Sequence, residues 1–229
     1  MASLQDTLQL NNQAVVLHHS DNLAQAAKAY HESLSFFKRL LKECYHHNQG
    51  IALSTVTQYE CFHTAAPTNA QRDVSTQSDD EPFVYQSALI LQETQSYLHN
   101  TQAMTIYCAG VVFNTAILHH RQAIKTGSSA SLDRAAKLYE ASLQLVLGQH
   151  IPAGSNSTVS LIAMAASNNL AQIELEKGLV CQACRRLQFL KILIQSLQHI
   201  VTRIFTMDEF QGMLSNTLSA ESVTASPAA

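Results

Sequence analysis

Residues 25–34 read QAAKAYHESL and residues 134–143 read RAAKLYEASL, and six of the ten positions are identical. In both stretches apolar residues recur at three- and four-residue spacing, which predicts an amphipathic helix. A weaker third copy at 168–190, NNLAQIELEKGLVCQACRRLQFL, aligns with residues 11–33 without a gap. A helix pattern that occurs three times in one chain predicts repeated helix pairs that stack on one another.

Small residues recur at matching places in the three copies. The six alanines are Ala14, Ala116 and Ala171 on the first helices, and Ala26, Ala135 and Ala183 on the second helices. Alanine lets two helices approach closely, and a bulky residue four positions later (Tyr30, Tyr139 or Leu187) fills the space toward the next unit. Because one helix pair cannot bury its apolar face alone, the units must stack, and about three are needed for stability.

Helical periodicity and the positions of the prolines outline the elements. The predicted helices span 5–19, 22–47, 97–125, 131–147, 158–177, 179–200 and 206–217. They group into repeat units at about 5–47, 97–147 and 158–200, followed by a capping helix at 206–217. Thr206 with Glu209 three residues later predicts a capping box at the start of that last helix. We therefore expect one helical-repeat domain over residues 1–217.

Two stretches differ from the helices in composition. Residues 50–96 contain TAAPTNAQRDVSTQSDDEP, which is polar, is interrupted by proline and cannot bury enough surface to offset its ordering entropy. We expect a long, polar, partly disordered surface insertion there, in which FVY at 83–85 is the only cluster of strand-forming residues. The tail at 218–229 is also expected to be disordered.

Composition and charge argue against several classes of partner. Charged residues make up only 14 % of the chain and the net charge is −3, so neither nucleic acid nor an anionic membrane is an expected partner. The most apolar stretch, 103–118, is shorter than the roughly 20 residues that span a bilayer. The N-terminus lacks the pattern of a secretory signal, and five cysteines without regular spacing suit a reducing compartment. We expect a cytoplasmic protein, with the nucleus as the alternative.

No motif predicts catalysis, a metal or a cofactor. The eleven histidines include three adjacent pairs, and neighbouring residues on a helix point about 100° apart, so such pairs cannot chelate a metal as residues four apart can. Cys181 and Cys184 form a lone CxxC without a second pair, and no glycine-rich phosphate loop is present. The acidic run after Ser78 is interpreted as a solubilising segment rather than a kinase site. We expect no enzyme.

The repeated pattern resembles the tetratricopeptide repeat, whose unit is about 34 residues long. The positions that carry the resemblance best are Leu10, Ala14, Leu17, Leu23, Ala26, Tyr30 and Ser33. The copy at 168–190 has the expected turn glycine, Gly178, but Leu190 occupies a small-residue position, and the copy at 112–143 has about seven extra residues in its turn. A fainter similarity, in the Asn-x-Ala helices and the segment 208–216, is to uncharacterised helical-repeat proteins of algal and diatom type and implies no function.

The resemblance implies an all-α fold, a right-handed α-solenoid of antiparallel helix pairs. It would contain three degenerate repeats, a long insertion and a C-terminal capping helix. In this family the first helices of successive units line a concave groove that takes a peptide or a partner helix. Carried over, the groove residues are Asn12, Val15, His18, His19, Asn114, Ile117, His120, Arg121, Asn169, Gln172 and Glu176. An asparagine amide both donates and accepts, so Asn12, Asn114 and Asn169 are suited to the backbone of an extended ligand. Alternatively, they satisfy helix-pair turns or neighbouring backbone.

The expected function is therefore a non-catalytic protein–protein interaction scaffold or adaptor that binds a peptide or a partner helix. The alternative from another class is a small-ligand-binding or regulatory helical protein, with an enzyme among the options, that uses His and Glu side chains of the groove. Residues 186–205 are apolar on several faces. We expect that stretch either to be covered by 206–217 or to self-associate, because an apolar patch of that size does not stay exposed.

Overall fold

A computed structural model describes residues 3–47, 62–64, 82–92, 101–148 and 157–225. The described residues form eight helices and two three-residue strands. In chain order these are α1 (Leu4–His19), α2 (Leu23–His47), β1 (Phe62–Thr64), β2 (Leu89–Leu91), α3 (Thr101–Thr126), α4 (Ser129–Leu147), α5 (Ser157–Glu176), α6 (Val180–Ser196), α7 (Gln198–Ile204) and α8 (Met207–Ala225). The all-α prediction is confirmed, and every predicted helix is found, although residues 97–100 lie outside the described part of the chain.

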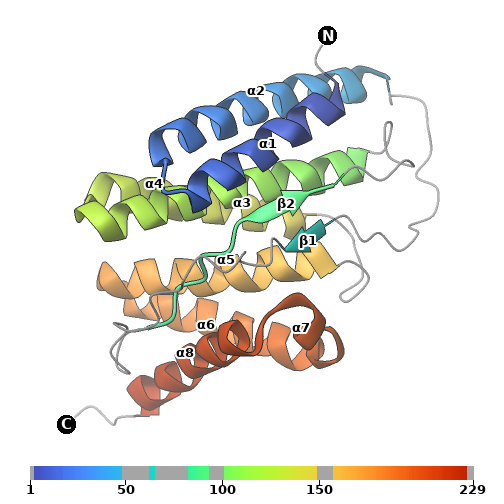
Figure 1. Cartoon of the computed structure of the whole chain (residues 1–229). Helices are drawn as coiled ribbons and strands as arrows, with labels where there is room; N and C mark the ends of the chain where they lie inside the picture. The colour runs from blue at the N-terminus through green and yellow to red at the C-terminus, as the bar shows by residue number, and fades with distance from the viewer. Residues whose placement is uncertain (1–2, 48–61, 65–81, 93–100, 149–156, 226–229) are drawn as a thin grey trace.

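Consecutive helices pack as pairs, and the pairs lie one on another. The pairs α1–α2, α3–α4 and α5–α6 each pack closely, and α2 contacts α3 while α4 contacts α5. Figure 1 shows the pairs in chain order from the N-terminus to the C-terminus, with α8 beside α6 at the far end. The turns between paired helices are tight: Gly127 and Gly178 adopt positive φ angles, at which a residue with a side chain would be strained.

The small residues that repeat in the sequence lie in the core. All six repeated alanines are fully buried, and Tyr30, Tyr139 and Leu187 are buried beside them. The repeated serines have matching roles: Ser33 donates to the carbonyl of Thr7 and Ser142 to the carbonyl of Ala109, both at 2.9 Å. The recurrence of QAAKAYHESL and RAAKLYEASL is thus a recurrence of packing between paired helices.

The C-terminal region differs from the prediction in two places. The helix predicted at 179–200 ends at Ser196, and α7 begins after Leu197. Residues 218–225, predicted to be disordered, continue α8, because this stretch contains no proline or glycine and its alanines and glutamate favour helix despite its low apolar content.

The apolar stretch at 186–205 is largely covered. Its buried side chains include Leu190, Ile194 and Phe205, and α8 packs on both α6 and α7, whereas Ile192 stays exposed. The predicted capping box is confirmed: Thr206 N donates to Glu209 Oε2 at 3.0 Å, and Glu209 N donates to Thr206 Oγ1 at 3.3 Å.

Residues 82–92, which we name the bridging segment, are the main departure from the prediction. The surface insertion predicted at 50–96 is wrong for this part, since Tyr85, Ala88, Leu89 and Leu91 are buried. The segment is extended; it crosses in front of α5 and ends at β2 beside α1 and α3 (Figure 1). On one edge β2 pairs antiparallel with β1, with Ile90 opposite His63. The rest of the predicted insertion, including Ser78, lies outside the described residues.

Candidate functional site: an asparagine-lined face

Six asparagines from four helices hold the backbone of the bridging segment. They are Asn11 and Asn12 on α1, Asn114 on α3, Asn168 and Asn169 on α5, and Asn216 on α8, and together we name them the asparagine face. The helices carry these side chains at equivalent places because the repeated sequence puts an asparagine two residues before a small core alanine on α1, α3 and α5. All but Asn12 are buried.

Four of the asparagines each make two hydrogen bonds to one residue of the segment. In each case the backbone N–H donates to Oδ1 and Nδ2 donates to the carbonyl of the same residue. The pairs are Asn12 with Leu91 (2.8 and 2.8 Å), Asn114 with Leu89 (2.7 and 2.8 Å), Asn169 with Tyr85 (2.8 and 2.8 Å) and Asn216 with Phe83 (3.1 and 2.8 Å). A side-chain amide used in this way replaces a neighbouring strand, since it offers one donor and one acceptor in the spacing of a backbone residue.

The six asparagines divide into two clusters with the same pattern of hydrogen bonds. In the first cluster, Asn11, Asn12 and Asn114, Nδ2 of Asn11 donates to Oδ1 of Asn12 at 3.1 Å and to the Leu89 carbonyl at 3.2 Å, and its own Oδ1 accepts from Asn114 at 3.0 Å. Asn114 and Asn11 therefore share one carbonyl, while Asn12 holds the residue two positions further along the segment.

The second cluster, Asn168, Asn169 and Asn216, repeats this arrangement on other helices. Nδ2 of Asn168 donates to Oδ1 of Asn169 at 3.1 Å and to the Phe83 carbonyl at 3.0 Å, and its Oδ1 accepts from Asn216 at 2.7 Å. Asn169 has one addition, because its Nδ2 also donates to the hydroxyl of Tyr139 at 2.9 Å. The two clusters thus bind residues at positions 83 and 85, and at 89 and 91, in the same way.

The side chains around the two clusters differ. Near the second cluster, the Tyr85 ring packs against Phe113 (centroids 6.0 Å apart) and edge-on against Phe205 (5.7 Å). Phe83 lies over Gly212 of α8, where an added Cβ would stand 2.3 Å from Cγ of the ring. Near the first cluster, Leu89 and Leu91 are buried where β2 packs against α1 and α3. The Tyr107 hydroxyl donates to the next carbonyl of the segment, that of Gln92, at 2.8 Å.

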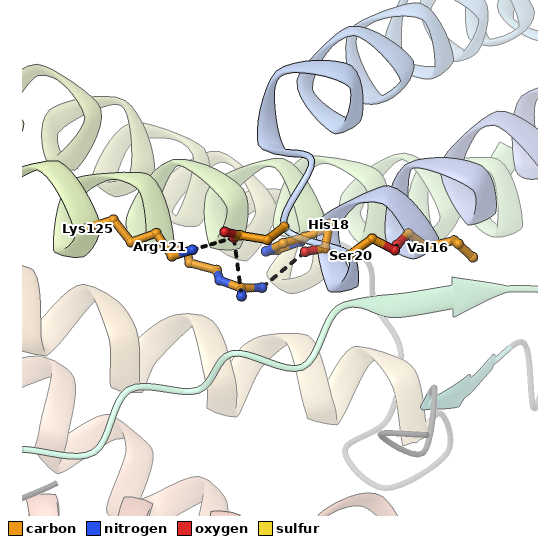
Figure 2. Close-up of polar contacts among 6 residues, drawn as sticks. Val16, His18, Ser20, Arg121 and Lys125 are labelled. Carbon is orange, nitrogen blue, oxygen red and sulfur yellow. Dashed lines mark hydrogen bonds and ion pairs between the residues drawn. The ribbon is translucent and has the colours of Figure 1, made fainter. Parts of the chain in front are cut away.

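A polar contact joins the turn after α1 to α3, beside the first cluster. Arg121 donates to the carbonyl of His18 at 3.1 Å and lies 3.4 Å from the Asp21 carboxylate, which Lys125 also contacts. Figure 2 shows Arg121 and Lys125 extending toward this turn. The cationic side chains here are therefore paired within the chain, and they lower the pKa of Asp21.

The histidines of this region are neutral. Burial, with a further contribution from Arg121, lowers the pKa of His18 to about 3, and neither ring nitrogen has a hydrogen-bond partner among the described residues. Burial lowers the pKa of His120 to about 4; its Nδ1 lies 3.4 Å from the Tyr139 hydroxyl. Burial raises the pKa of Glu174, although Arg186 lies 3.5 Å from its Oε1.

The structure brings together only part of the predicted groove set. Asn12, Asn114 and Asn169 lie together against extended backbone, as the sequence suggested for a ligand, but the backbone is the chain's own. Val15 and Ile117 are core residues and Gln172 is buried, whereas His19 and Glu176 are exposed.

Sequence reasoning missed Asn11, Asn168 and Asn216 and the bridging segment itself. The signal was present in the Asn-Asn doublets at 11–12 and 168–169, and in the apolar triplets FVY at 83–85 and LIL at 89–91.

No group of three His, Cys, Asp or Glu side chains suited to a metal ion occurs among the residues that the structure describes. Cys181 is exposed and Cys184 half-buried, and neither is in a disulfide. In the described part of the chain, no helix combines the length and hydrophobicity that a membrane crossing requires. Comparison with family models, with curated proteins and with solved structures found no match.

Proposed function

We propose that this chain is a non-catalytic peptide-binding scaffold whose asparagine face binds an extended polypeptide through its backbone. The observation that carries the proposal is the set of four asparagines that each hold both the N–H and the carbonyl of one residue in the bridging segment. In this view residues 82–92 occupy the site as an internal ligand.

The arrangement of the helices supports this proposal. Three stacked helix pairs, each with an asparagine near the middle of its first helix, agree with a tetratricopeptide-like right-handed solenoid in which first helices form the binding side. Recognition through main-chain hydrogen bonds gives affinity independently of ligand side chains, as in strand addition to a sheet edge. The charge of the face is compatible with a peptide ligand, because all six recognition side chains are neutral amides.

The test is to exchange the segment after folding. Protease sites inserted directly before Pro82 and directly after Gln92 would let the full chain fold with its segment in place and then release it on cleavage. A fluorescent peptide with the sequence PFVYQSALILQ is then titrated into the cleaved protein, with circular dichroism to verify that the helices remain. We expect saturable binding that unlabelled peptide competes away.

Two modified peptides test whether the backbone is recognised. N-methylation at Tyr85 and Leu89 removes the two N–H groups held by Asn169 and Asn114, and should weaken binding by at least about tenfold, since each buried hydrogen bond contributes about 1 kcal/mol. The matched control is N-methylation at the exposed Gln86. The proposal is wrong if the folded, cleaved protein does not bind the parent peptide, or if the two methylated peptides bind equally well.

A further inference from the structure

The bridging segment contains two similar triplets six residues apart, and each triplet is held by one of the two asparagine clusters. Phe83 and Tyr85 are bound by the second cluster, and Leu89 and Leu91, six positions later, are bound by the first. Phe-Val-Tyr and Leu-Ile-Leu are both apolar triplets whose first and third residues are held by asparagine. Between them lie Gln86, Ser87 and Ala88, a spacer to which no asparagine of the described residues hydrogen-bonds.

We propose that the asparagine face selects a bipartite segment of a partner protein: an aromatic-x-aromatic anchor, a spacer of three residues, and an aliphatic-x-aliphatic anchor. The aromatic anchor comes first in the partner and lies against α5 and α8, and the aliphatic anchor lies against α1 and α3. This inference rests on the proposed function, because it specifies the ligand that the face would take when its own segment is displaced.

At the aromatic end of the segment, a glycine on α8 leaves space for the Phe83 ring, and two other rings pack against Tyr85. Gly212 sits in the interior of α8, where glycine costs about 1 kcal/mol relative to alanine, and the space that it leaves is filled by the Phe83 ring. Phe113 and Phe205 surround the Tyr85 ring, one tilted and one edge-on, which is a favourable geometry for aromatic pairs. A branched aliphatic side chain has no flat face to use these contacts.

The aliphatic end is defined by close burial on both sides. Leu89 and Leu91 are buried completely, and β2 contacts α1 and α3 on one side while β1 pairs with its other edge. Leu91 is followed by Gln92, whose carbonyl accepts from the Tyr107 hydroxyl at 2.8 Å. The segment is thus fixed at its C-terminal end, which sets its direction.

The spacer fixes the distance between the two anchors. Ala88 is buried and Ser87 donates to Glu209 Oε1 at 2.6 Å, while Gln86 is exposed. In an extended chain, successive residues direct their N–H and carbonyl groups to opposite edges. One inserted spacer residue therefore turns one anchor away from its cluster, because both clusters are fixed on helices.

The inference is tested with peptides on the cleaved full-length protein, with the parent peptide as reference. A glycine inserted after Gln86 should weaken binding by at least about tenfold, whereas the same glycine added before Pro82 should change it less than twofold. A peptide with its anchors exchanged, PLILQSAFVYQ, has the same composition and should also bind at least about tenfold more weakly.

The outcomes separate the two proposals. If the parent peptide binds and the inserted and exchanged peptides bind equally well, the bipartite ligand is wrong while backbone recognition stands. If the parent peptide itself does not bind, the proposed function fails. If a labelled uncleaved copy of this chain occupies the cleaved protein more tightly than the parent peptide does, the occupant is a second copy rather than a partner protein, and the inference is overturned.

Discussion

The two asparagine clusters bind backbone in the same way but hold different side chains. In each cluster, the first asparagine of a doublet and a single asparagine on another helix donate to the same carbonyl. The second asparagine of the doublet holds the residue two positions further along the segment. The first cluster holds Leu89 and Leu91, which are buried. The second holds Phe83 and Tyr85, and the Tyr85 ring packs against Phe113 and Phe205. The comparison teaches that main-chain recognition comes from the repeated asparagines, whereas side-chain selection comes from what each helix packs beside them.

Acid should produce the largest effect, and it should act through the two buried histidines His18 and His120. His18 on α1 and His120 on α3 have pKa values lowered to about 3 and about 4, while the described residues of α5 and α8 contain no histidine. The unfolded chain takes up protons below its ordinary histidine pKa of about 6.5 and the folded chain does not. Stability should therefore fall as the pH drops below about 6.5, by on the order of 1.4 kcal/mol per pH unit for each histidine, until the pH approaches the folded pKa.

Urea unfolding between pH 7 and pH 4.5 measures this slope. The variants His18→Gln and His120→Gln should each flatten it, and His31→Gln, at an exposed position, should not. Equal slopes in all variants would contradict the buried neutral state of these histidines.

The next largest loss of stability should come from removing the single asparagine of each cluster. Asn114→Ala leaves the buried N–H of Leu89 without its acceptor and Oδ1 of Asn11 without one donor. We expect a loss of roughly 3 kcal/mol in the free energy of unfolding. Asn216→Ala removes the acceptor of the N–H of Phe83, which is only partly buried, and the donor to Oδ1 of Asn168, and should cost roughly 2 kcal/mol. Gln13→Ala on exposed α1 surface is the control, and equal losses at Asn114 and Asn216 would show that burial does not distinguish the clusters.

A smaller effect tests the aromatic end alone. Gly212→Ala places a methyl group against Phe83, and the overpacking cost of about 1–3 kcal/mol is partly offset by about 1 kcal/mol of helix propensity. We expect a net loss of roughly 1 kcal/mol in thermal or urea unfolding. In a Phe83→Ala background the same change should stabilise the protein. A loss of the same size in both backgrounds would mean that Gly212 does not accommodate the ring.

The smallest effect falls on the spacer between the clusters. Ser87→Ala removes the hydroxyl that donates to Glu209 Oε1, while Glu209 keeps its capping contacts with Thr206. Because this bond is only partly buried, we expect a loss of about 0.5 kcal/mol in the free energy of unfolding. Ser196→Ala, whose hydroxyl bonds only within its own helix turn on the surface, is the matched control and should change stability by less than half of this.

Much of the fold was predictable because helical periodicity and the spacing of small residues are local signals. The alanines of both repeated decapeptides were predicted to pack closely, and they are buried. The asparagines at 12, 114 and 169 recur at one place in the repeat, and they were predicted either to bind the backbone of an extended ligand or to satisfy helix-pair turns or neighbouring backbone. They bind extended backbone of this chain. The bridging segment was missed because its eleven residues are flanked by polar sequence, and the average composition of 50–96 hid two apolar triplets.

Asn11, Asn168 and Asn216 could not be assigned for a different reason. They act on residues between 48 and 133 positions away in the chain, or on one another, and no local pattern specifies such distant pairing. The aromatic surroundings of Tyr85 likewise combine Phe113 and Phe205, which only the packing of α3 near the C-terminal helices brings together.

The path of the bridging segment has a consequence for how the chain folds. A stack of helix pairs is held by contacts between neighbours, so it can form progressively from any point. Here Phe83 bonds to Asn216, 133 positions away, and Leu91 bonds to Asn12, 79 positions away. These contacts raise the contact order and join the first helix to the last through one strand. The bridging segment thereby couples the first helix pair to the last helix, so that losing the contacts at one end should weaken those at the other.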